Sequence, residues 1–212
     1  MIIVISNPTS IVKEHAIINQ LFDEGLETFH LRKKLYSENE IKKFIELISE
    51  KYFKRIVLHT NYHLAKEYNM KGIHVPAVSN YKSSKGSLSI SFHSINEIEK
   101  SDKTFDYGFL SPLFDSISKA GYKSKFDLEE VKVFLQKHKS HNNKSGDPSE
   151  NVKGKLREQI IALGGIDIDK IDNVKELGFS GIALMGAIWQ SENPIEKFKL
   201  IKEKWLLKEP MF

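Results

Sequence analysis

Residues 160–189 read IIALGGIDIDKIDNVKELGFSGIALMGAIW, and this stretch decides the fold class. It contains two short apolar runs, Ile160–Leu163 and Gly181–Leu184, and a glycine follows each run within two residues. The segment between the runs mixes apolar and charged residues with the period of an amphipathic helix. A strand, a glycine turn and a helix repeated in this way indicate consecutive strand–helix units.

The same alternation extends over the rest of the chain, in units of about 20 to 30 residues. The opening run Ile2–Ile5 has no polar alternation, which predicts a strand covered on both faces, as in a parallel sheet. Eight strands, most of them followed by a helix, fit a closed (β/α)8 TIM barrel that forms a single domain over residues 1–212. The predicted strands are Ile2–Ser6, Thr28–Arg32, Arg55–Leu58, Gly72–His74, Leu88–Ser91, Tyr107–Leu110, Ile160–Leu163 and Gly181–Leu184.

The rival architecture is an open doubly wound sheet, which would need only about five or six of these strands. Its dinucleotide fingerprint, Gly-x-Gly-x-x-Gly after the first strand, is missing here. The strand count therefore favours the barrel.

Three helix starts carry recognisable signals. The sequence Ser37-Glu38-Asn39-Glu40 predicts a capping box, and Ser94-Ile95-Asn96-Glu97 predicts a second one. Asn193-Pro194 opens the last helix, with proline at a position where its missing amide hydrogen has no consequence. One stretch breaks the rhythm: residues from about 138 to 157 are polar and aperiodic, which predicts a surface insert before the seventh strand.

The composition excludes several classes of protein. A hydrophobic fraction of 40% and a charged fraction of 28% over 212 residues are those of an ordinary globular chain, not of a disordered or collagen-like one. The absence of cysteine removes disulfides, thiolate metal sites and cysteine nucleophiles. A net charge of +4 is too diffuse to indicate nucleic acid, although it suits phosphate-bearing ligands. With no run of transmembrane length, we expect a cytoplasmic protein without a membrane partner.

Histidines gather where the active site of such a barrel lies, at the carboxyl ends of the strands. Four of the eight histidines fall at this rim, at positions 30, 59, 74 and 93. His59 and His63 have the i, i+4 spacing of helical metal ligands, which His30 and His74 could complete. However, no carboxylate ends the third or fourth strand, and loop or rim histidines satisfied by hydrogen bonds are the commoner case. We therefore assign no metal ligands from the sequence.

Glycines follow the last two strands, at Gly164-Gly165 and Met185-Gly186. Barrels of this class often bind phosphate there, because glycine lets backbone amides approach the anion. The alternative is that each glycine only makes a tight turn. Two such turns in consecutive units favour phosphate binding.

The second strand ends in His30-Leu31-Arg32-Lys33-Lys34, and alternation sends His30, Arg32 and Lys34 to one side. Three groups that can carry positive charge would suit a phosphate or diphosphate, although a solvated basic loop is the simpler interpretation. The loop after the sixth strand offers Ser116, Ser118 and Lys119 to an anion, a weak signal by itself.

His93 stands two residues after Ser91, just before a capped helix. A histidine there is a candidate for proton transfer, because its charge changes near neutral pH. The alternative is a residue near the helix start that only satisfies backbone groups.

Taken together, the ordered motifs resemble the thiamine phosphate synthase/TenI family over almost the whole chain. They are FHLRKK (29–34), GIHVPAVS (72–79), SISFHSINEIE (89–99), FDYGFLSPLFDSISKAG (105–121), IIALGGI (160–166) and FSGIALMGAIWQSENP (179–194). The resemblance implies a phosphate-binding barrel of thiamine biosynthesis, whose synthases join hydroxymethylpyrimidine diphosphate to thiazole phosphate with the help of Mg²⁺.

The resemblance also implies roles for residues. Arg32 and Lys34 match the family's diphosphate contacts, and His30 replaces the usual glutamine before them. Ser91 and His93 match a serine and a histidine of the family. Ser116, Ser118 and Lys119 match its Thr-x-Thr-Lys loop, and Gly164, Gly165, Met185 and Gly186 match its thiazole-phosphate cradle.

This chain departs from the family where the synthases carry the acids that bind Mg²⁺: Thr60 and Ser79 stand there instead. The TenI branch of the family catalyses tautomerisation of a thiazole phosphate, an isomerase reaction that has no leaving group and needs no metal. This branch carries a histidine at the position of His93. We therefore expect a TenI-like tautomerase without a required cofactor, acting on a small phosphorylated thiazole. The alternatives are the Mg²⁺-dependent synthase, a non-catalytic binder of thiazole or thiamine phosphate, and a metal-dependent hydrolase using the histidine-rich rim. The sequence leaves open whether the chain forms a homo-oligomer.

Overall fold

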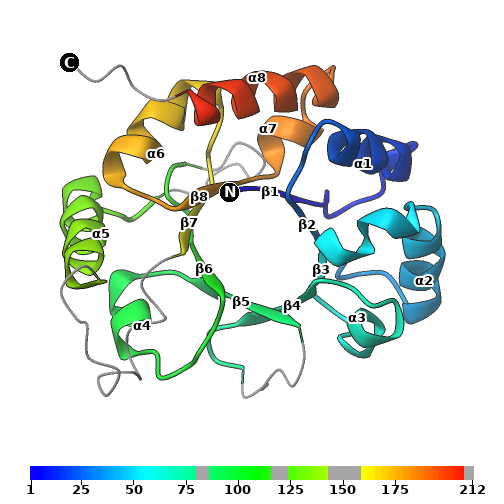
Figure 1. Ribbon diagram of the computed structural model, residues 1–212, viewed down its shortest axis with the longest axis horizontal. Coiled ribbons are helices and arrows are strands. Elements are labelled where there is room, and N and C mark those ends of the chain that lie inside the picture. The colour runs from blue at the N-terminus through cyan, green and yellow to red at the C-terminus, as the bar shows by residue number, and fades with distance from the viewer. Residues whose placement is uncertain (80–85, 116–123, 143–158, 208–212) are drawn as a thin grey trace.

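A closed barrel of eight parallel strands forms the centre of the computed structural model, which describes residues 1–79, 86–115, 124–142 and 159–207. Each strand pairs with the next along the chain, and β1 pairs with β8 to close the ring, as Figure 1 shows from one end of the barrel. This closure confirms the predicted (β/α)8 barrel and excludes the open sheet. The strands are β1 (Ile2–Ile5), β2 (Thr28–Leu31), β3 (Ile56–Leu58), β4 (Gly72–Pro76), β5 (Ser87–Phe92), β6 (Tyr107–Leu110), β7 (Ile160–Leu163) and β8 (Gly181–Leu184).

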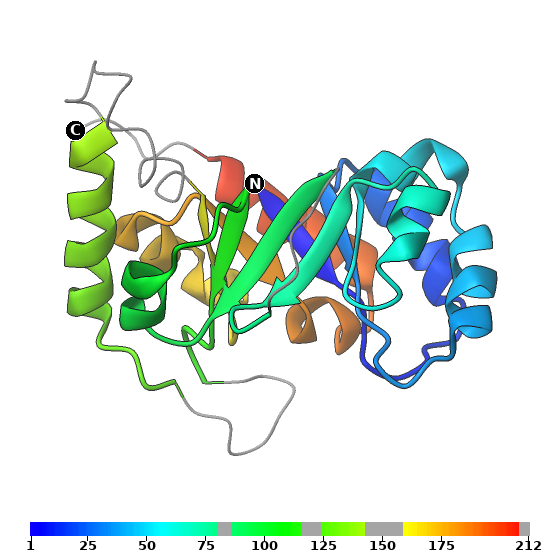
Figure 2. The same ribbon diagram turned by 90° about the horizontal axis from the view of Figure 1, so that it is seen from below.

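Helices surround the barrel on its outer side (Figures 1 and 2). Between β4 and β5 the described residues contain no helix, and elsewhere at least one helix or helical turn separates consecutive strands. In the described part of the chain the α-helices are α1 (Glu14–Asp23), α2 (Glu38–Glu46), α3 (His63–Glu67), α4 (Ile95–Lys100), α5 (Leu128–Asn142), α6 (Ile171–Leu177), α7 (Gly186–Trp189) and α8 (Pro194–Leu206). Two 3-10 helices there, η1 (Glu50–Arg55) and η3 (Ile168–Lys170), precede β3 and α6. None of these described helices has the length and apolar character needed to cross a membrane.

The strand β1 shows why an unbroken apolar run folds as predicted. Alternate side chains point to opposite faces of a strand. Ile3 and Ile5 lie inside the barrel in a cluster with Tyr107 and Phe109, whereas Ile2 and Val4 belong to the larger core between the strands and the helices. Both faces of β1 are therefore buried, as the sequence predicts for a parallel strand.

The three predicted helix starts are present with their caps. Ser37 and Glu40 form a complete capping box at α2. The Ser94 side chain accepts a hydrogen bond from the backbone N–H of Glu97 at α4, and Asn193 does the same for Glu196 at α8. At α4 the Glu97 carboxylate accepts the N–H of His93 and not that of Ser94, so this box is displaced by one residue.

The helix α5 extends further than the sequence indicates. Residues 138–142, predicted to begin a polar insert, form its last turn, because helical hydrogen bonding continues into a polar stretch. The remainder of the predicted insert, residues 143–157, lies outside the described residues.

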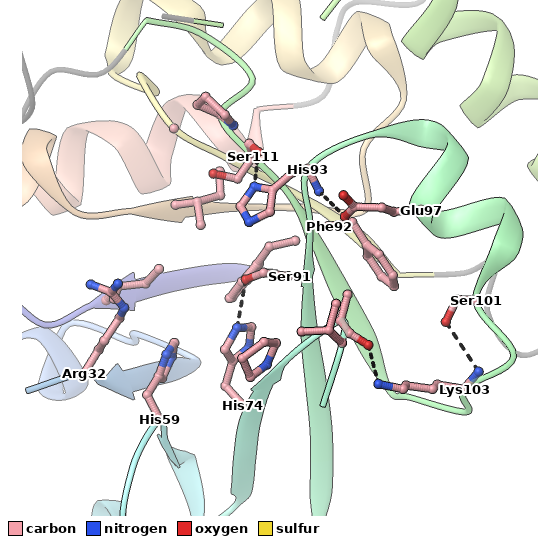
Figure 3. Close-up of a pocket in the computed structure, with 18 of the residues that line it drawn as sticks. Arg32, His59, His74, Ser91, Phe92, His93, Glu97, Ser101, Lys103 and Ser111 are labelled. Carbon is pink, nitrogen blue, oxygen red and sulfur yellow. Dashed lines mark hydrogen bonds between the residues drawn. The ribbon is translucent and has the colours of Figure 1, made fainter. Parts of the chain in front are cut away.

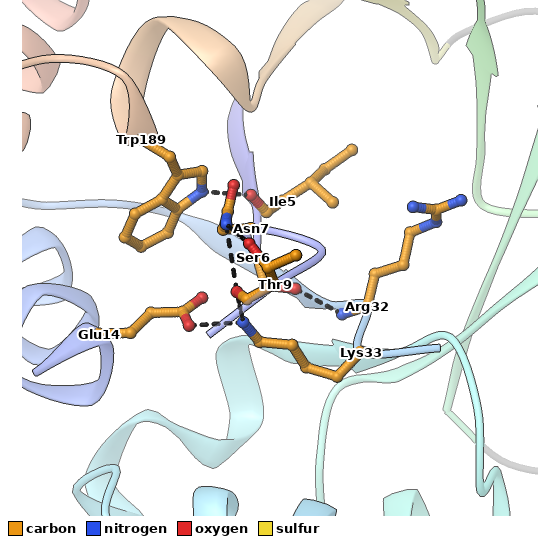
Figure 4. Close-up of polar contacts among 8 residues, drawn as sticks. All are labelled: Ile5, Ser6, Asn7, Thr9, Glu14, Arg32, Lys33 and Trp189. Carbon is orange, nitrogen blue, oxygen red and sulfur yellow. Dashed lines mark hydrogen bonds and ion pairs between the residues drawn. The ribbon is translucent and has the colours of Figure 1, made fainter. Parts of the chain in front are cut away.

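A group of polar contacts fixes the chain just after β1 and β2 (Figure 4). Ser6 Oγ accepts the backbone N–H of Arg32 at 2.8 Å. The next residue, Lys33, is buried and forms an ion pair of 2.5 Å with the equally buried Glu14, while also donating to the carbonyl of Thr9. These contacts turn Lys33 outward to the helix layer and leave Arg32 facing the barrel mouth.

Candidate functional site

A cavity of about 900 Å³ opens at the carboxyl ends of the strands, where the sequence predicts the active site. Residues at or just beyond the ends of all eight strands contribute to its wall. Figure 3 shows five of these side chains around one space, those of Arg32, His59, His74, Ser91 and His93, with Phe92, Glu97, Ser101 and Lys103 to one side of it. The lining residues are Ile5, Arg32, Lys34, His59, Tyr62, His74, Pro76, Ala77, Val78, Ser91, Phe92, His93, Asn96, Glu97, Lys100, Ser101, Asp102, Lys103, Phe109, Ser111, Pro112, Leu163, Gly164 and Met185.

His93 is held at this cavity by contacts to its backbone and its ring. Its backbone N–H donates to Oε2 of Glu97 at 2.8 Å, and Nδ1 of the ring lies 2.8 Å from the carbonyl oxygen of Ser111 (Figure 3). A carbonyl oxygen can only accept, so Nδ1 carries the hydrogen. In the neutral ring Nε2 therefore keeps its lone pair and can accept a proton.

Positive charge predominates along the cavity wall. The lining includes four lysine or arginine side chains, Arg32, Lys34, Lys100 and Lys103, against two carboxylates, Glu97 and Asp102. Partial burial lowers the pKa of Arg32, although its guanidinium keeps its charge at any physiological pH. A wall of this composition suits an anionic ligand.

Three histidines form a compact cluster in and below the cavity floor, which we call the histidine cluster: His30, His59 and His74. Nδ1 of His30 lies 2.8 Å from Nε2 of His59, and the rings of His59 and His74 stack with centroids 4.2 Å apart. On its other side, Nε2 of His30 lies 2.7 Å from the hydroxyl of Tyr107. The cluster thus continues from the cavity into the barrel interior.

Burial keeps the histidine cluster uncharged. The pKa values of His30 and His59 lie well below the usual value for histidine, mainly because both rings are buried. Neighbouring groups that can carry positive charge lower both pKa values further. Burial also lowers the pKa of His74 to about 3, with Arg32 adding to the effect. All three imidazoles are neutral at pH 7.

Two serines hold the ring of His74 in one orientation. Ser89 Oγ lies 2.9 Å from Nδ1 of His74 and 3.4 Å from the carbonyl oxygen of Ile73; with its own hydrogen directed to that carbonyl, it accepts the Nδ1 hydrogen. Nε2 of His74 is then the acceptor of the hydroxyl of Ser91, 2.8 Å away. His74 and Ser91 both line the cavity, so this hydrogen bond lies at the edge of the ligand space.

Backbone conformation and close packing explain why glycine occupies both positions after β7, which the sequence alone does not reveal. Gly164 and Gly165 have φ angles of 101° and 65°, which favour glycine. A Cβ atom would lie 2.7 Å from Pro112 Cα at the first position and 2.3 Å from the carbonyl oxygen of Asp115 at the second. The turn therefore packs tightly against the chain after β6.

The structure brings together many of the predicted site residues. Arg32, Lys34, Ser91, His93, Gly164 and Met185 all line the cavity. His30 does not: it lies one layer deeper and is fully buried, because the end of β2 places Arg32 at the mouth. Gly165 and Gly186 are also absent from the lining, and Ser116, Ser118 and Lys119 lie outside the described residues.

Other lining residues were missed in the sequence. Lys103, for example, donates through Nζ to the carbonyls of Ala77 and Ser79, and so ties the loop after α4 to the chain after β4. Nothing in its neighbourhood, Ser101-Asp102-Lys103-Thr104, distinguishes it from a solvated loop. By contrast, the sequence does single out Glu97, because this residue belongs to a predicted capping box.

Comparisons with known proteins agree with this geometry. The family model described as "Thiamine monophosphate synthase" matches residues 2–188. Curated thiamine-phosphate synthases from Flavobacterium johnsoniae and Flavobacterium psychrophilum are 25% and 23% identical, and each alignment covers 94% of this chain and 93% or 96% of the relative.

Solved structures agree as well. A thiamine phosphate pyrophosphorylase from Bacteroides thetaiotaomicron is 33% identical, with a TM-score of 0.76 and 96% of both chains covered. A thiamine phosphate pyrophosphorylase from Pyrococcus furiosus, at 16% identity and a TM-score of 0.71 over 96% of this chain and 94% of its own, shares the fold. Because the family model spans all eight strands and the residues that line the cavity, this chain belongs to the thiamine monophosphate synthase family.

Proposed function

We propose that the protein acts on a phosphorylated thiazole and catalyses its tautomerisation, as in the TenI branch of the family. The observation that carries the proposal is the setting of His93, a ring with a fixed tautomer in a cationic cavity. A tautomerisation moves a proton between carbon atoms of one molecule. It requires a group that accepts and returns a proton, and a grip on the substrate.

His93 is suited to the proton transfer. With Nδ1 bonded to the carbonyl of Ser111, Nε2 is the nitrogen that accepts a proton from one ring carbon. The imidazolium then donates a proton to the second position, and the substrate leaves as its aromatic isomer. The reaction releases no leaving group and consumes no second reactant, because only a proton moves between the substrate and His93.

The phosphate of the substrate would bind where the ends of β7 and β8 meet the cavity. Gly164 and Met185 line it there, from consecutive strand–helix units. Gly164 has no side chain, and a Cβ there would meet Pro112, which also lines the cavity. The lysines and Arg32 of the wall add favourable long-range attraction for the anion.

The donor set beside Arg32 does not fit Mg²⁺, the ion that the family's synthases use. This ion prefers carboxylate and phosphate oxygens. The residues after β3 and β4 are HTN at 59–61 and AVS at 77–79, which contain no acid. Of the two lining carboxylates, that of Glu97 is engaged by the backbone of His93, and both belong to the α4 side.

Coupling of a pyrimidine diphosphate to the thiazole phosphate is the second candidate. It is supported by the name thiamine-phosphate synthase, which relatives matched over nearly their whole length carry. The two candidates differ in their requirement for a divalent metal, and this difference decides the test.

The experiment supplies the purified protein with the carboxylated thiazole phosphate tautomer, and in parallel with thiazole phosphate plus hydroxymethylpyrimidine diphosphate. We expect tautomerisation that EDTA does not inhibit, and a loss of about 10²- to 10⁴-fold in His93→Asn. His63→Asn, at an exposed histidine on α3, is the matched control and should retain full activity. Robust Mg²⁺-dependent formation of thiamine phosphate would overturn the assignment, as would full activity of His93→Asn. Tight binding without turnover would indicate a non-catalytic binding protein.

A further inference from the structure

The histidine cluster has the composition of a site for a borderline transition metal. Each of the three rings offers one nitrogen, and these atoms lie within 4.8 Å of one another. We propose that His30, His59 and His74 form a three-histidine binding site for Zn²⁺ or a similar divalent ion, such as Co²⁺, with a fourth position open to the cavity. This site is separate from the proton-transfer role of His93 and does not depend on it.

The chemistry of the ligands supports this assignment. A metal needs the lone pair of a neutral imidazole, and protonation competes with binding. His30 and His74 are buried and His59 is half-buried, and burial disfavours the charged form of an imidazole. Three imidazoles with one open position are a common zinc ligand set, whereas Mg²⁺ prefers oxygen ligands.

Hydroxyl groups lie beside the outer nitrogens, in the place that a carboxylate, a backbone carbonyl or water usually takes around metal-binding histidines. Ser89 accepts the Nδ1 hydrogen of His74, which leaves Nε2 as the ligand atom. The Tyr107 hydroxyl, 2.7 Å from Nε2 of His30, can accept a hydrogen there and leave Nδ1 as the ligand atom. The hydroxyls of Ser89 and Tyr107 thus stand where each can accept the N–H hydrogen of a metal-bound ring.

The three ligand nitrogens must move to reach tetrahedral spacing, because their separations range up to 4.8 Å and the rings of His59 and His74 stack rather than converge on one point. His30 Nδ1 and His59 Nε2 are 2.8 Å apart and share one hydrogen. Tetrahedral ligands at about 2.0 to 2.1 Å from zinc are roughly 3.3 Å from each other, so the rings would separate by about half an ångström. That hydrogen would move to the Tyr107 side of His30, and the bond from Ser91 to His74 Nε2 would be replaced by the metal.

The position of the cluster makes the site accessible. His59 and His74 line the cavity, and His59 is the half-buried member of the three. The fourth ligand would therefore be water or an oxygen of an anionic ligand in the cavity beside Arg32 and Ser91. Closed structural zinc sites lack such a position, so this is the open type of site.

The test uses the full chain, stripped with EDTA and titrated with Co²⁺ and with Zn²⁺ by calorimetry. We expect one ion per chain, the visible absorption bands of tetrahedral Co²⁺, and a melting temperature that rises with metal concentration, because the ion binds only the folded chain. His59→Gln and His74→Gln should each weaken binding by more than tenfold. His63→Gln is the matched control, since this exposed ring pairs with Glu38 and lies outside the cluster.

A milder variant keeps the test decisive if a histidine variant fails to fold. Tyr107→Phe removes only the hydroxyl beside His30 and should weaken Co²⁺ binding by about 10- to 100-fold. The proposal is overturned if wild-type protein shows no tetrahedral Co²⁺ spectrum, or if His63→Gln loses as much affinity as His59→Gln. The cluster would then be a hydrogen-bonded network alone.

Discussion

The ammonium of Lys33 lies 2.5 Å from Oε2 of Glu14, and both side chains are withdrawn from solvent, with exposed fractions of 0% and 2% (Figure 4). The second carboxylate oxygen of Glu14 is buried without a hydrogen bond partner among the described residues. Burial accordingly raises the pKa of Glu14, although the Lys33 hydrogen bond opposes the shift. This pair anchors the segment that presents Arg32 and Lys34 to the cavity.

Replacing one partner of this ion pair should destabilise the fold more than replacing both partners. Lys33→Met leaves a buried carboxylate without its partner, and a loss of about 3 to 5 kcal/mol of unfolding free energy is expected. The double variant Lys33→Met/Glu14→Leu should recover part of that loss, because no buried charge remains. Urea unfolding of Lys33→Met, Glu14→Leu and the double variant measures the coupling energy between the two residues. Strictly additive losses would contradict a direct interaction.

The histidine cluster should make the protein sensitive to mild acid. In the unfolded chain these rings have a pKa near 6.5, whereas the folded values are lower, about 3 for His74. Below about pH 6.5 the unfolded chain therefore binds protons that the folded chain does not, and stability falls as the pH falls. Each ring contributes a slope of up to about 1.4 kcal/mol per pH unit, or about 4 kcal/mol for three.

The measurement is the unfolding free energy between pH 7 and pH 4.5 in the presence of EDTA. His59→Gln/His74→Gln should give a clearly shallower decline than wild type, since two of the titrating groups are gone. Carboxylates titrate in both proteins and cancel in the comparison. Parallel declines in the two proteins would show that the cluster is not responsible.

Arg32 should contribute to binding anions in the cavity. Arg32→Met removes a charge that can donate to phosphate oxygens, and hydrogen bonds to charged groups contribute about 1.5 to 3 kcal/mol, or roughly 10- to 100-fold in affinity. Calorimetry with inorganic pyrophosphate measures the loss, and the salt dependence of binding should become weaker. Lys43→Met, at an exposed position on α2, is the control for the net charge. Equal affinity of Arg32→Met and wild type would place the anion elsewhere.

The Gly165 turn should tolerate no side chain. Gly178→Ala tests only the cost of a positive φ, about 1 kcal/mol, at the end of α6. Gly165→Ala adds the approach to the Asp115 carbonyl, so we expect a total loss of about 2 to 4 kcal/mol. Thermal unfolding distinguishes the two variants. If they were equally stable, the chain after β6 would not be packed against this turn.

The strands of this barrel could be predicted because their signals are local. The run Ile2–Ile5 and the glycine-bounded runs Ile160–Leu163 and Gly181–Leu184 carry their own boundaries. The end of α5 was missed, since helical hydrogen bonding continued through a polar sequence that has no apolar period.

The sequence predicts at which end of the barrel the site lies, but not how deeply its side chains are buried. Alternation along β2 indicates that His30 and Arg32 share a face, but the depth of His30 depends on how eight strands are staggered around the ring. The same stagger brings Tyr107, from β6, to within hydrogen-bonding distance of His30. Lys33 was grouped with a basic loop, although the alternation that turns Arg32 inward turns Lys33 toward α1, where Glu14 lies.

The hydrogen bonds inside the barrel also have a consequence for folding accuracy. Apolar side chains can exchange places with little loss, but His30 finds its two partners, His59 and Tyr107, in a single alignment of neighbouring strands. A slip of β2 by one residue would put Phe29 and Leu31 inside and leave the imidazole among aliphatic helix contacts, where its nitrogens would have nothing to bond. A misaligned barrel would thus be penalised at its centre, so these polar rings help to select one strand alignment over its near neighbours.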